Sequence, residues 1–211
     1  SAFPIVGIGA CAGGLDAVKG FLRGLPPDPE MAFVLVMHLS PDRESHLEDL
    51  LQSVTSMPVS TVVEGTDLEP AHLYVLAPRT ELRIEDGSRL VPEVQPERDG
   101  AYHPIDLLFR SLAEEAGSRS VGVVLSGSGT DGSQGVREIN QQNGFVLVQD
   151  PAEAAFSSMP SAAIRAVPPD LIGSARELGR QLAETLEAPR AAELPERSED
   201  LLGQDVDRFH R

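Results

Sequence analysis

The residues best suited to chemistry lie in the stretch 5–14, where an apolar run ends in a turn that carries Cys11, the only cysteine of the chain. The motif Gly9-x-Cys11-x-Gly13 has the spacing of a nucleophile elbow, a tight strand-to-helix turn that exposes one reactive side chain beside converging backbone N–H groups. Apolar residues at helical spacing follow over residues 15–22. The stretch therefore predicts a thiol nucleophile presented at the start of a helix.

Two other interpretations of this turn stay open at the level of the motif. Gly7-x-Gly9-x-x-Ala12 also fits the glycine pattern of dinucleotide-binding folds, and a single cysteine is often a small buried hydrophobe. A dinucleotide fold, however, needs an acidic residue near the end of its second strand to bind the ribose hydroxyls. His38 occupies that position, which counts against cofactor binding.

His38 and Asp131 are the two residues that could act together with Cys11. His38 follows the apolar run 31–37, and Asp131 lies in the glycine-rich loop that follows the apolar run 120–125. The carboxyl ends of parallel strands meet at one edge of a sheet, so all three side chains are expected at that edge. A nucleophile, a base and an acid that orients the base are the parts of a catalytic triad, which is defined by geometry and not by chain order.

The elements that must position these residues alternate between strand and helix along the chain. This alternation predicts an α/β fold with a doubly wound, mostly parallel sheet, helices on both faces and an antiparallel edge hairpin. Further strands are predicted at 59–63 and 145–148, helices at 46–54, 104–115, 136–143 and 175–187 with a small one from Ser161, and the hairpin over 73–77, 82–84 and 90–91.

Composition limits the partners and the compartment. The chain has 211 residues and a formal net charge of −16, with no cluster of Lys or Arg to offset it, so nucleic acid is a poor partner. No apolar run reaches membrane-spanning length, which argues against membrane insertion. A single cysteine fits a reducing, cytoplasmic setting, and the histidines lack metal-ligand spacing, so neither a metal nor another cofactor is expected.

The chain divides into two parts by composition. Residues 1–187 contain all the predicted elements and are expected to form one catalytic domain. Residues 188–211 are charged, contain proline and have few large apolar side chains, which is typical of a linker or tail.

Several motifs in order along the chain resemble the catalytic domain of chemotaxis protein-glutamate methylesterases of the CheB type. They lie over about residues 4–187 and comprise Gly7–Leu15, His38-Leu39-Ser40-Pro41, Ser126–Gly132, Gln149-Asp150 and Met159-Pro160. The sequences His38–Asp42 and His103-Pro104-Ile105-Asp106 are most similar to the subgroup fused to a receptor methyltransferase.

The resemblance implies an enzyme that removes methyl groups from glutamyl esters on receptor signalling helices, releases methanol and also deamidates glutamines. It implies methylated receptor helices, and a methyltransferase domain or partner, as the molecules this chain meets. The family's triad falls on Cys11, His38 and Asp131. The oxyanion and substrate pocket then falls on Ala12, Gly13, Ser128, Gly129 and Met159.

One position departs from the family pattern, because the family's nucleophile is a serine and this chain has Cys11. A thiol attacks readily, but a thiolate leaves a tetrahedral adduct more easily than methoxide does. We therefore expect a working hydrolase that forms a cysteinyl thioester, with slower or altered turnover. The alternative is a methylesterase-like docking or sensing module with impaired catalysis.

Overall fold

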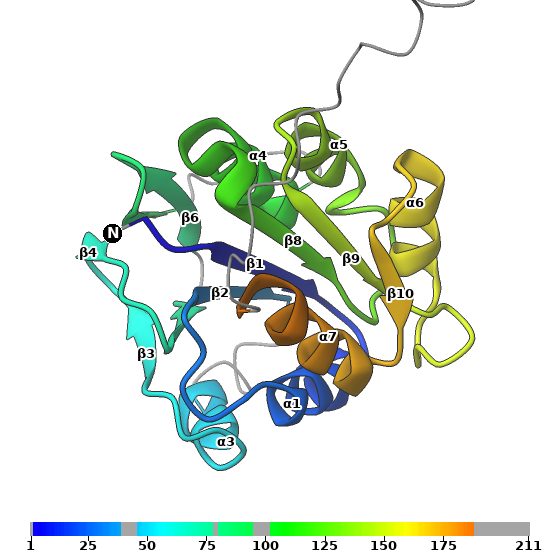
Figure 1. Cartoon of the computed structure of the whole chain (residues 1–211), viewed down its shortest axis with the longest axis horizontal. Helices are drawn as coiled ribbons and strands as arrows, with labels where there is room; N and C mark the ends of the chain where they lie inside the picture. The colour runs from blue at the N-terminus through cyan, green and yellow to red at the C-terminus, as the bar shows by residue number, and fades with distance from the viewer. Residues whose placement is uncertain (1, 39–45, 78–79, 95–101, 188–211) are drawn as a thin grey trace, which may run out of the picture.

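The structure is a computed structural model that describes residues 2–38, 46–77, 80–94 and 102–187 (Figure 1). Its centre is a sheet of seven parallel strands in the order β10-β9-β8-β1-β2-β5-β3. The strands are β1 (Ile5–Ala10), β2 (Ala32–Met37), β3 (Val59–Val62), β5 (His72–Leu76), β8 (Ser120–Val124), β9 (Phe145–Gln149) and β10 (Leu171–Gly173). The predicted α/β class with a mostly parallel sheet is confirmed.

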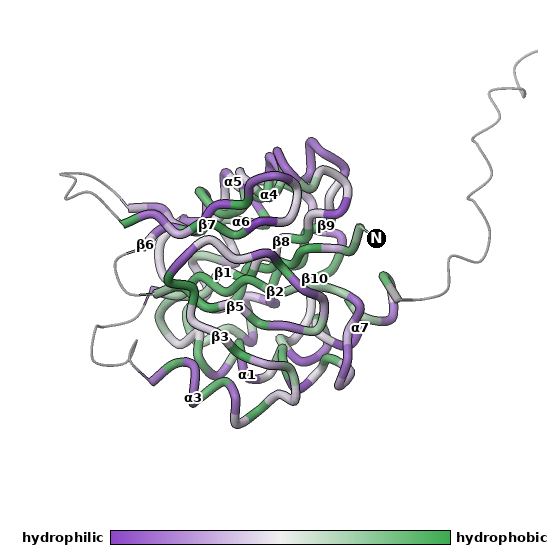
Figure 2. The backbone as a smooth tube through the Cα atoms, turned by 90° about the vertical axis from the view of Figure 1, so that its left-hand side faces the viewer, coloured by the Kyte–Doolittle hydropathy of each residue, from purple (hydrophilic) through white to green (hydrophobic). Residues whose placement is uncertain are grey.

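Helices cover both faces of this sheet and enclose two hydrophobic cores. The helices α1 (Gly14–Gly24), α3 (Leu47–Gln52) and α7 (Ala175–Glu187) lie on one face, and α4 (Pro104–Ala116), α5 (Ser133–Gln141) and α6 (Ser158–Ala166) lie on the other. A short 3₁₀ turn, Gly117–Arg119, follows α4. Figure 2 shows the three layers edge-on, with the apolar strands in the middle. This arrangement explains the nearly continuous apolar runs of the central strands, which are buried on both faces.

The glycines of β1 serve helix packing. A Cβ at Gly7 would lie 2.6 Å from the Cδ1 atom of Leu112, and one at Gly9 would lie 2.5 Å from the Cγ2 atom of Ile105, both on α4. Because both glycines lie inside the strand and face this helix, the glycine pattern is accounted for by close strand-to-helix approach. This removes the main support for the dinucleotide interpretation.

The antiparallel hairpin exists, but its place differs from the prediction. It consists of β6 (Thr80–Glu85) and β7 (Arg89–Val94), which form a separate three-stranded sheet with β4 (Thr66–Asp67). The segment 73–77, predicted as part of the hairpin, instead falls largely in β5, inside the parallel sheet. The hairpin buries an apolar face in the core beneath α4 and is tied to it, since the Ile84 N–H donates to the Ser111 Oγ at 3.0 Å.

Helix boundaries otherwise follow the sequence pattern closely, except at α5 and α6. Each of these two helices begins three residues earlier than predicted, α5 at Ser133 and α6 at Ser158. The short strands β4 and β10 were not predicted. The tail 188–211, the residues 39–42 after His38 and most of the polar loop before Tyr102 lie outside the described residues. Within the described ranges, no helix is both long and apolar enough to cross a bilayer.

Candidate active site

Cys11 lies in a tight turn between β1 and α1. The Gly14 N–H donates to the Cys11 carbonyl at 2.8 Å, and Gly13 has φ 67° and ψ 4°. Ala12 has no positive φ, so the turn is of type II, with glycine at the position that requires a left-handed backbone. The thiol is half-buried. The predicted strand–turn–helix presentation of Cys11 is therefore observed.

A side chain at Gly13 would distort this turn. Its Cβ would lie 2.8 Å from the Ala155 Cβ and 3.0 Å from the Phe156 ring, in addition to the cost of a positive φ. We expect Gly13→Ala to lower the free energy of unfolding by roughly 1–3 kcal/mol and to slow alkylation of Cys11 by iodoacetamide. Gly129→Ala is the matched control, because Gly129 also has a positive φ but a Cβ there meets no atom within 4 Å. Equal alkylation rates in both variants would contradict this role for Gly13.

His38 directly follows the neighbouring strand β2 and lies beside Cys11. Ala10 pairs with Met37 in the register of β1 and β2, and the His38 N–H donates to the Ala10 carbonyl at 3.4 Å, so the next residues along both strands, Cys11 and His38, are neighbours. The ring of His38 also packs against Tyr102, with the two ring centres 5.6 Å apart. Within the described residues, the Cys11 thiol forms no hydrogen bond to His38.

Asp131 is the hydrogen-bond partner of His38. The His38 Nε2 lies 3.3 Å from the Asp131 Oδ2. An ionised carboxylate only accepts hydrogen bonds, so Nε2 carries the proton in this pair and Nδ1 carries the free lone pair. The structure thus brings the histidine and the acid predicted from separate loops into contact, and leaves one imidazole nitrogen available as a base.

The Asp131 carboxylate is buried and fixed at the start of α4. It accepts the backbone N–H groups of Ile105 at 3.0 Å, Asp106 at 2.9 Å and Gly132 at 2.9 Å. The N–H groups of Ile105 and Asp106 belong to the first turn of α4 and have no acceptor within the helix itself. The helix dipole also favours a negative charge at this end. Besides its contact with His38, Asp131 therefore caps a helix that begins with Pro104 and has no side-chain cap of its own.

Asp106, on α4, caps the next helix, α5, in the same way. Its Oδ1 accepts the N–H groups of Gln134 at 3.0 Å and Gly135 at 2.8 Å, in the first turn of α5. The loop that carries Asp131 runs directly into α5, so α4 and α5 cap each other reciprocally. This contact explains why α5 starts at Ser133, earlier than the apolar pattern indicates.

Asp106 gives a pH-dependent prediction. Burial raises the pKa of this carboxyl above its ordinary value of 3.8, opposed by the N–H groups of α5 and helped by the nearby charge of Asp131. A raised pKa means that stability is highest with the proton bound and falls as pH rises through that pKa. Asparagine keeps the acceptor and does not ionise. In thermal melts, we expect Asp106→Asn to gain stability relative to the parent as the pH is raised above 3.8. His103 lies near the side chain of residue 106 in both proteins, so its charge is common to the comparison. A stability difference between the two proteins that does not change with pH would contradict this prediction.

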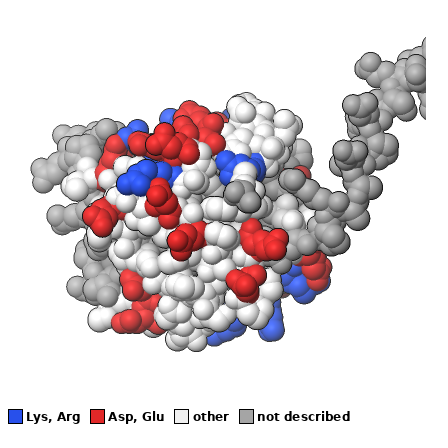
Figure 3. Space-filling model, turned by 60° about the vertical axis from the view of Figure 1, so that its left-hand side comes forward, with Lys and Arg blue, Asp and Glu red and all other residues white. Residues whose placement is uncertain are grey.

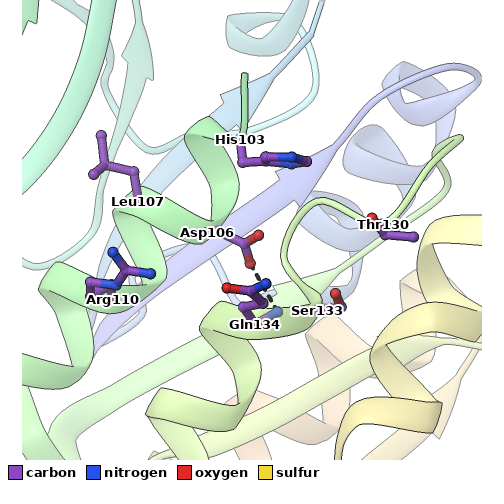
Figure 4. A pocket seen from close by; sticks show the side chains of 7 residues that line it. All are labelled: His103, Asp106, Leu107, Arg110, Thr130, Ser133 and Gln134. Carbon is purple, nitrogen blue, oxygen red and sulfur yellow. Dashed lines mark hydrogen bonds between the residues drawn. The ribbon is translucent and has the colours of Figure 1, made fainter. Parts of the chain in front are cut away.

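A pocket of about 240 Å³ opens beside Asp131 (Figure 4). It is lined by His103, Asp106, Leu107, Arg110, Thr130, Ser133 and Gln134. The His103 Nδ1 lies 3.8 Å from the Asp131 Oδ1, on the other side of the carboxylate from His38. His103, Asp106 and Asp131 each offer a ligand atom within 4.8 Å of the others, but both Asp131 oxygens and one Asp106 oxygen already accept hydrogen bonds. The cluster is thus accounted for by helix capping.

Of the predicted oxyanion and pocket residues, Ala12 and Gly13 lie in the Cys11 turn, Met159 packs close to it, and Ser128 and Gly129 lie in the loop after β8. In the described part of the chain, the N–H groups of Ala12, Gly13 and Ser128 have no hydrogen-bond partner, whereas that of Gly129 donates to the Ser158 Oγ at 3.3 Å. Met159 is buried, and a Cβ at Gly127 would lie 2.8 Å from its sulfur and 2.9 Å from the Cys11 Cβ. Ala12 and Gly13 therefore offer the free donors nearest to the sulfur along the chain.

Sequence reasoning missed three residues of this site. Asp106 and Tyr102 contact Asp131 and His38, and the buried Ser126 contacts the Cys11 turn. The sequence signal for Asp106 was its position three residues into a helix opened by His103-Pro104, where acidic residues commonly interact with helix N-termini. Ser126 lies in the motif Ser126–Gly132, which could have drawn attention to it, and Tyr102 carried no signal.

Comparison with known proteins gives one consistent family. The sequence profile described as CheB methylesterase matches residues 6–182. A protein-glutamate methylesterase/protein-glutamine glutaminase of the group 3 operon from Pseudomonas putida is 33% identical over 160 residues, which cover 75% of this chain and 47% of that protein. A protein of Leptospira interrogans named as a putative protein-glutamate methylesterase/protein-glutamine glutaminase is 28% identical over 171 residues, which cover 81% of this chain and 89% of that protein.

A solved structure shares the fold. The crystal structure of the Thermotoga maritima CheB methylesterase catalytic domain superposes with a TM-score of 0.80 at 23% identity, over 88% of this chain and 100% of that domain. The chain spans about half the length of several of the curated relatives it matches, including the one from Pseudomonas putida.

Proposed function

The chain belongs to the CheB methylesterase family, and from that premise we propose that it hydrolyses glutamate γ-methyl esters on chemoreceptor-type signalling proteins through Cys11, His38 and Asp131. The observation that carries the proposal is the hydrogen-bonded His38–Asp131 pair beside the Cys11 turn, at the carboxyl ends of three adjacent strands, β8, β1 and β2. That placement supplies a nucleophile, a base and an orienting acid together.

The first half of the proposed reaction forms a thioester. The Nδ1 of His38 takes the thiol proton, and the Cys11 sulfur attacks the γ-carbonyl carbon of the ester. The negative charge on the carbonyl oxygen is stabilised by the free N–H groups of Ala12 and Gly13. His38 then gives its proton to the methoxy oxygen, the C–O bond breaks and methanol leaves.

The second half restores the enzyme. His38 takes a proton from water, the hydroxide attacks the thioester carbon, and the C–S bond breaks to give glutamate and the Cys11 thiol, which regains its proton. The demanding step is the first collapse, because the thiolate leaves more easily than methoxide unless His38 protonates the methanol oxygen. The same steps on a glutamine side chain release ammonia and amount to deamidation.

The proposed partners are methylated signalling helices of receptors, with a methyltransferase domain or partner as the source of the methyl esters. We place the reaction in the cytoplasm, where a free thiol is kept reduced. On the face shown in Figure 3, acidic and basic side chains are interspersed among the described residues, with no extended basic patch. Such a surface fits a protein partner better than a nucleic acid.

The test is methanol release from a methylated receptor signalling fragment, with mass spectrometry of the product. We expect enzyme-dependent methanol and a 14 Da loss at each modified glutamate. An unchanged substrate after prolonged incubation with the folded chain would overturn the proposal.

A docking or sensing module is the second candidate, and the missing hydrogen bond between Cys11 and His38 favours it. Thiol chemistry separates the two. An activated Cys11 should alkylate faster in the parent than in a His38→Ala variant, whereas a docking module would give equal rates in both.

A further inference from the structure

Ser126 connects the nucleophile turn to two other segments of the chain, at Phe156 and Gln149. Its backbone carbonyl accepts the Cys11 N–H at 3.0 Å, and its hydroxyl donates to the Ala12 carbonyl at 3.1 Å. The same hydroxyl accepts the Phe156 N–H at 3.0 Å, and the Ser126 N–H donates to the Gln149 Oε1 at 2.8 Å. The residue is only 1% exposed. One buried serine therefore holds the chain on both sides of the reactive sulfur.

The bond to the Ala12 carbonyl fixes the central peptide of the turn. Types I and II of the β-turn differ mainly by a flip of this peptide, here the unit formed by the Ala12 carbonyl and the Gly13 N–H. The carbonyl and N–H of a trans peptide point in opposite directions. With the Ala12 carbonyl bound to Ser126, the Gly13 N–H is directed away from Ser126, and it has no partner within the described residues.

The neighbouring peptide is fixed in a similar way. The Cys11 carbonyl accepts the Gly14 N–H at 2.8 Å, which leaves the Ala12 N–H pointing away from that bond and, in the described structure, without a partner. Both free donors next to Cys11 thus belong to peptides whose carbonyls are already bonded. A flip of the central peptide would remove the Gly13 donor and replace it with a carbonyl oxygen, which repels a developing negative charge.

We propose that Ser126 is a positioning residue, whose hydroxyl holds the central peptide of the turn so that the Gly13 N–H stabilises the oxyanion. The inference rests on the proposed esterase function. It assigns to Ser126 no contact with the substrate, and it predicts an effect on the reaction step with little effect on substrate binding.

The variants are Ser126→Ala, Ser126→Thr and the matched control Ser111→Ala. Ser111 lies on the buried face of α4. Its hydroxyl makes the same kinds of bond, accepting the Ile84 N–H at 3.0 Å and donating to the Leu108 carbonyl at 2.9 Å. Removal of the Ser111 hydroxyl should therefore lower the free energy of unfolding by a similar amount without changing the Cys11 turn. Thermal melts establish that each variant is folded at the assay temperature.

Two readouts test the inference. We expect Ser126→Ala to lower kcat for methanol release by about 10- to 100-fold, somewhat below the loss of a full oxyanion donor, with KM changed by less than about threefold. Ser126→Ala should also bind a substrate peptide with a γ-aldehyde in place of the ester more weakly than the parent does, by a similar factor, because the adduct of the aldehyde with Cys11 carries the oxyanion. A γ-alcohol peptide, which forms no adduct, should bind unchanged.

The remaining variants decide between positioning and general stability. Ser126→Thr keeps the hydroxyl and should recover most of kcat, and Ser111→Ala should match the parent in both readouts. Unchanged kcat and aldehyde affinity in Ser126→Ala, or equal losses in Ser111→Ala, would overturn the role of Ser126. A parent that neither releases methanol nor binds the aldehyde would overturn the proposed function, and the inference with it.

Discussion

Replacement of Cys11 by alanine is expected to lower methanol release from a methylated receptor fragment by roughly 10⁶-fold, the scale seen when the nucleophile is removed from a catalytic triad. The reason is that no other described side chain beside the His38–Asp131 pair carries a thiol or a hydroxyl on the nucleophile turn. Cys11 packs at the edge of the core, and alanine keeps its Cβ, so folding should be preserved.

Cys11→Ser is the informative companion variant. The hydroxyl is a weaker nucleophile but a poorer leaving group than the thiol, so the tetrahedral adduct partitions more often toward loss of methanol. We expect the serine variant to exceed the alanine variant by at least about 10²-fold in methanol release. Activity in Cys11→Ala equal to that of the parent would refute the nucleophile role.

Asp131→Ala is expected to have the second-largest effect, and it should affect both activity and stability. Loss of the group that orients the histidine costs about 10⁴-fold in triad enzymes. Loss of the α4 cap should also lower the free energy of unfolding by about 1–3 kcal/mol, since the N–H groups of Ile105 and Asp106 lose their acceptor in a buried setting.

Asp170→Ala controls for the loss of a carboxylate that accepts a backbone N–H group. Asp170 accepts the Val146 N–H at 2.8 Å at the start of β9, at the amino end of the sheet and away from the Cys11 turn. The Asp170→Ala variant should be less stable than the parent, with little change in its rate of methanol release. The account of Asp131 would be contradicted by an Asp131→Ala variant that melts lower but keeps parental activity.

The sequence predicted the site well where position along a strand decides the outcome. Cys11 and His38 each follow an apolar run, and in a parallel sheet that is enough to place both at the same edge. Their direct adjacency depends on β1 and β2 being neighbours in register, which the pattern did not specify. Asp131 was predicted at this edge, but its bonds to α4 depend on how the α4 and α5 helices pack.

The sequence failed where burial came from a partner that the pattern did not identify. The hairpin of β6 and β7 was predicted at the sheet edge. Its apolar face is instead buried beneath α4, and nothing in the local sequence showed that this helix covers it. The start of α5 at Ser133 was not predicted for a similar reason, because the residue that caps this helix, Asp106, lies on another helix.

The central claim is that the substrate becomes covalently bound to Cys11 during turnover. The most direct measurement is intact-mass spectrometry of the parental chain, quenched in acid while it turns over a methylated receptor peptide. The account predicts a species heavier by the mass of the peptide minus methanol, located at Cys11, absent from Cys11→Ala and released by hydroxylamine. Steady methanol release with no adduct at Cys11 at any quench time, and an equal rate in Cys11→Ala, would contradict it.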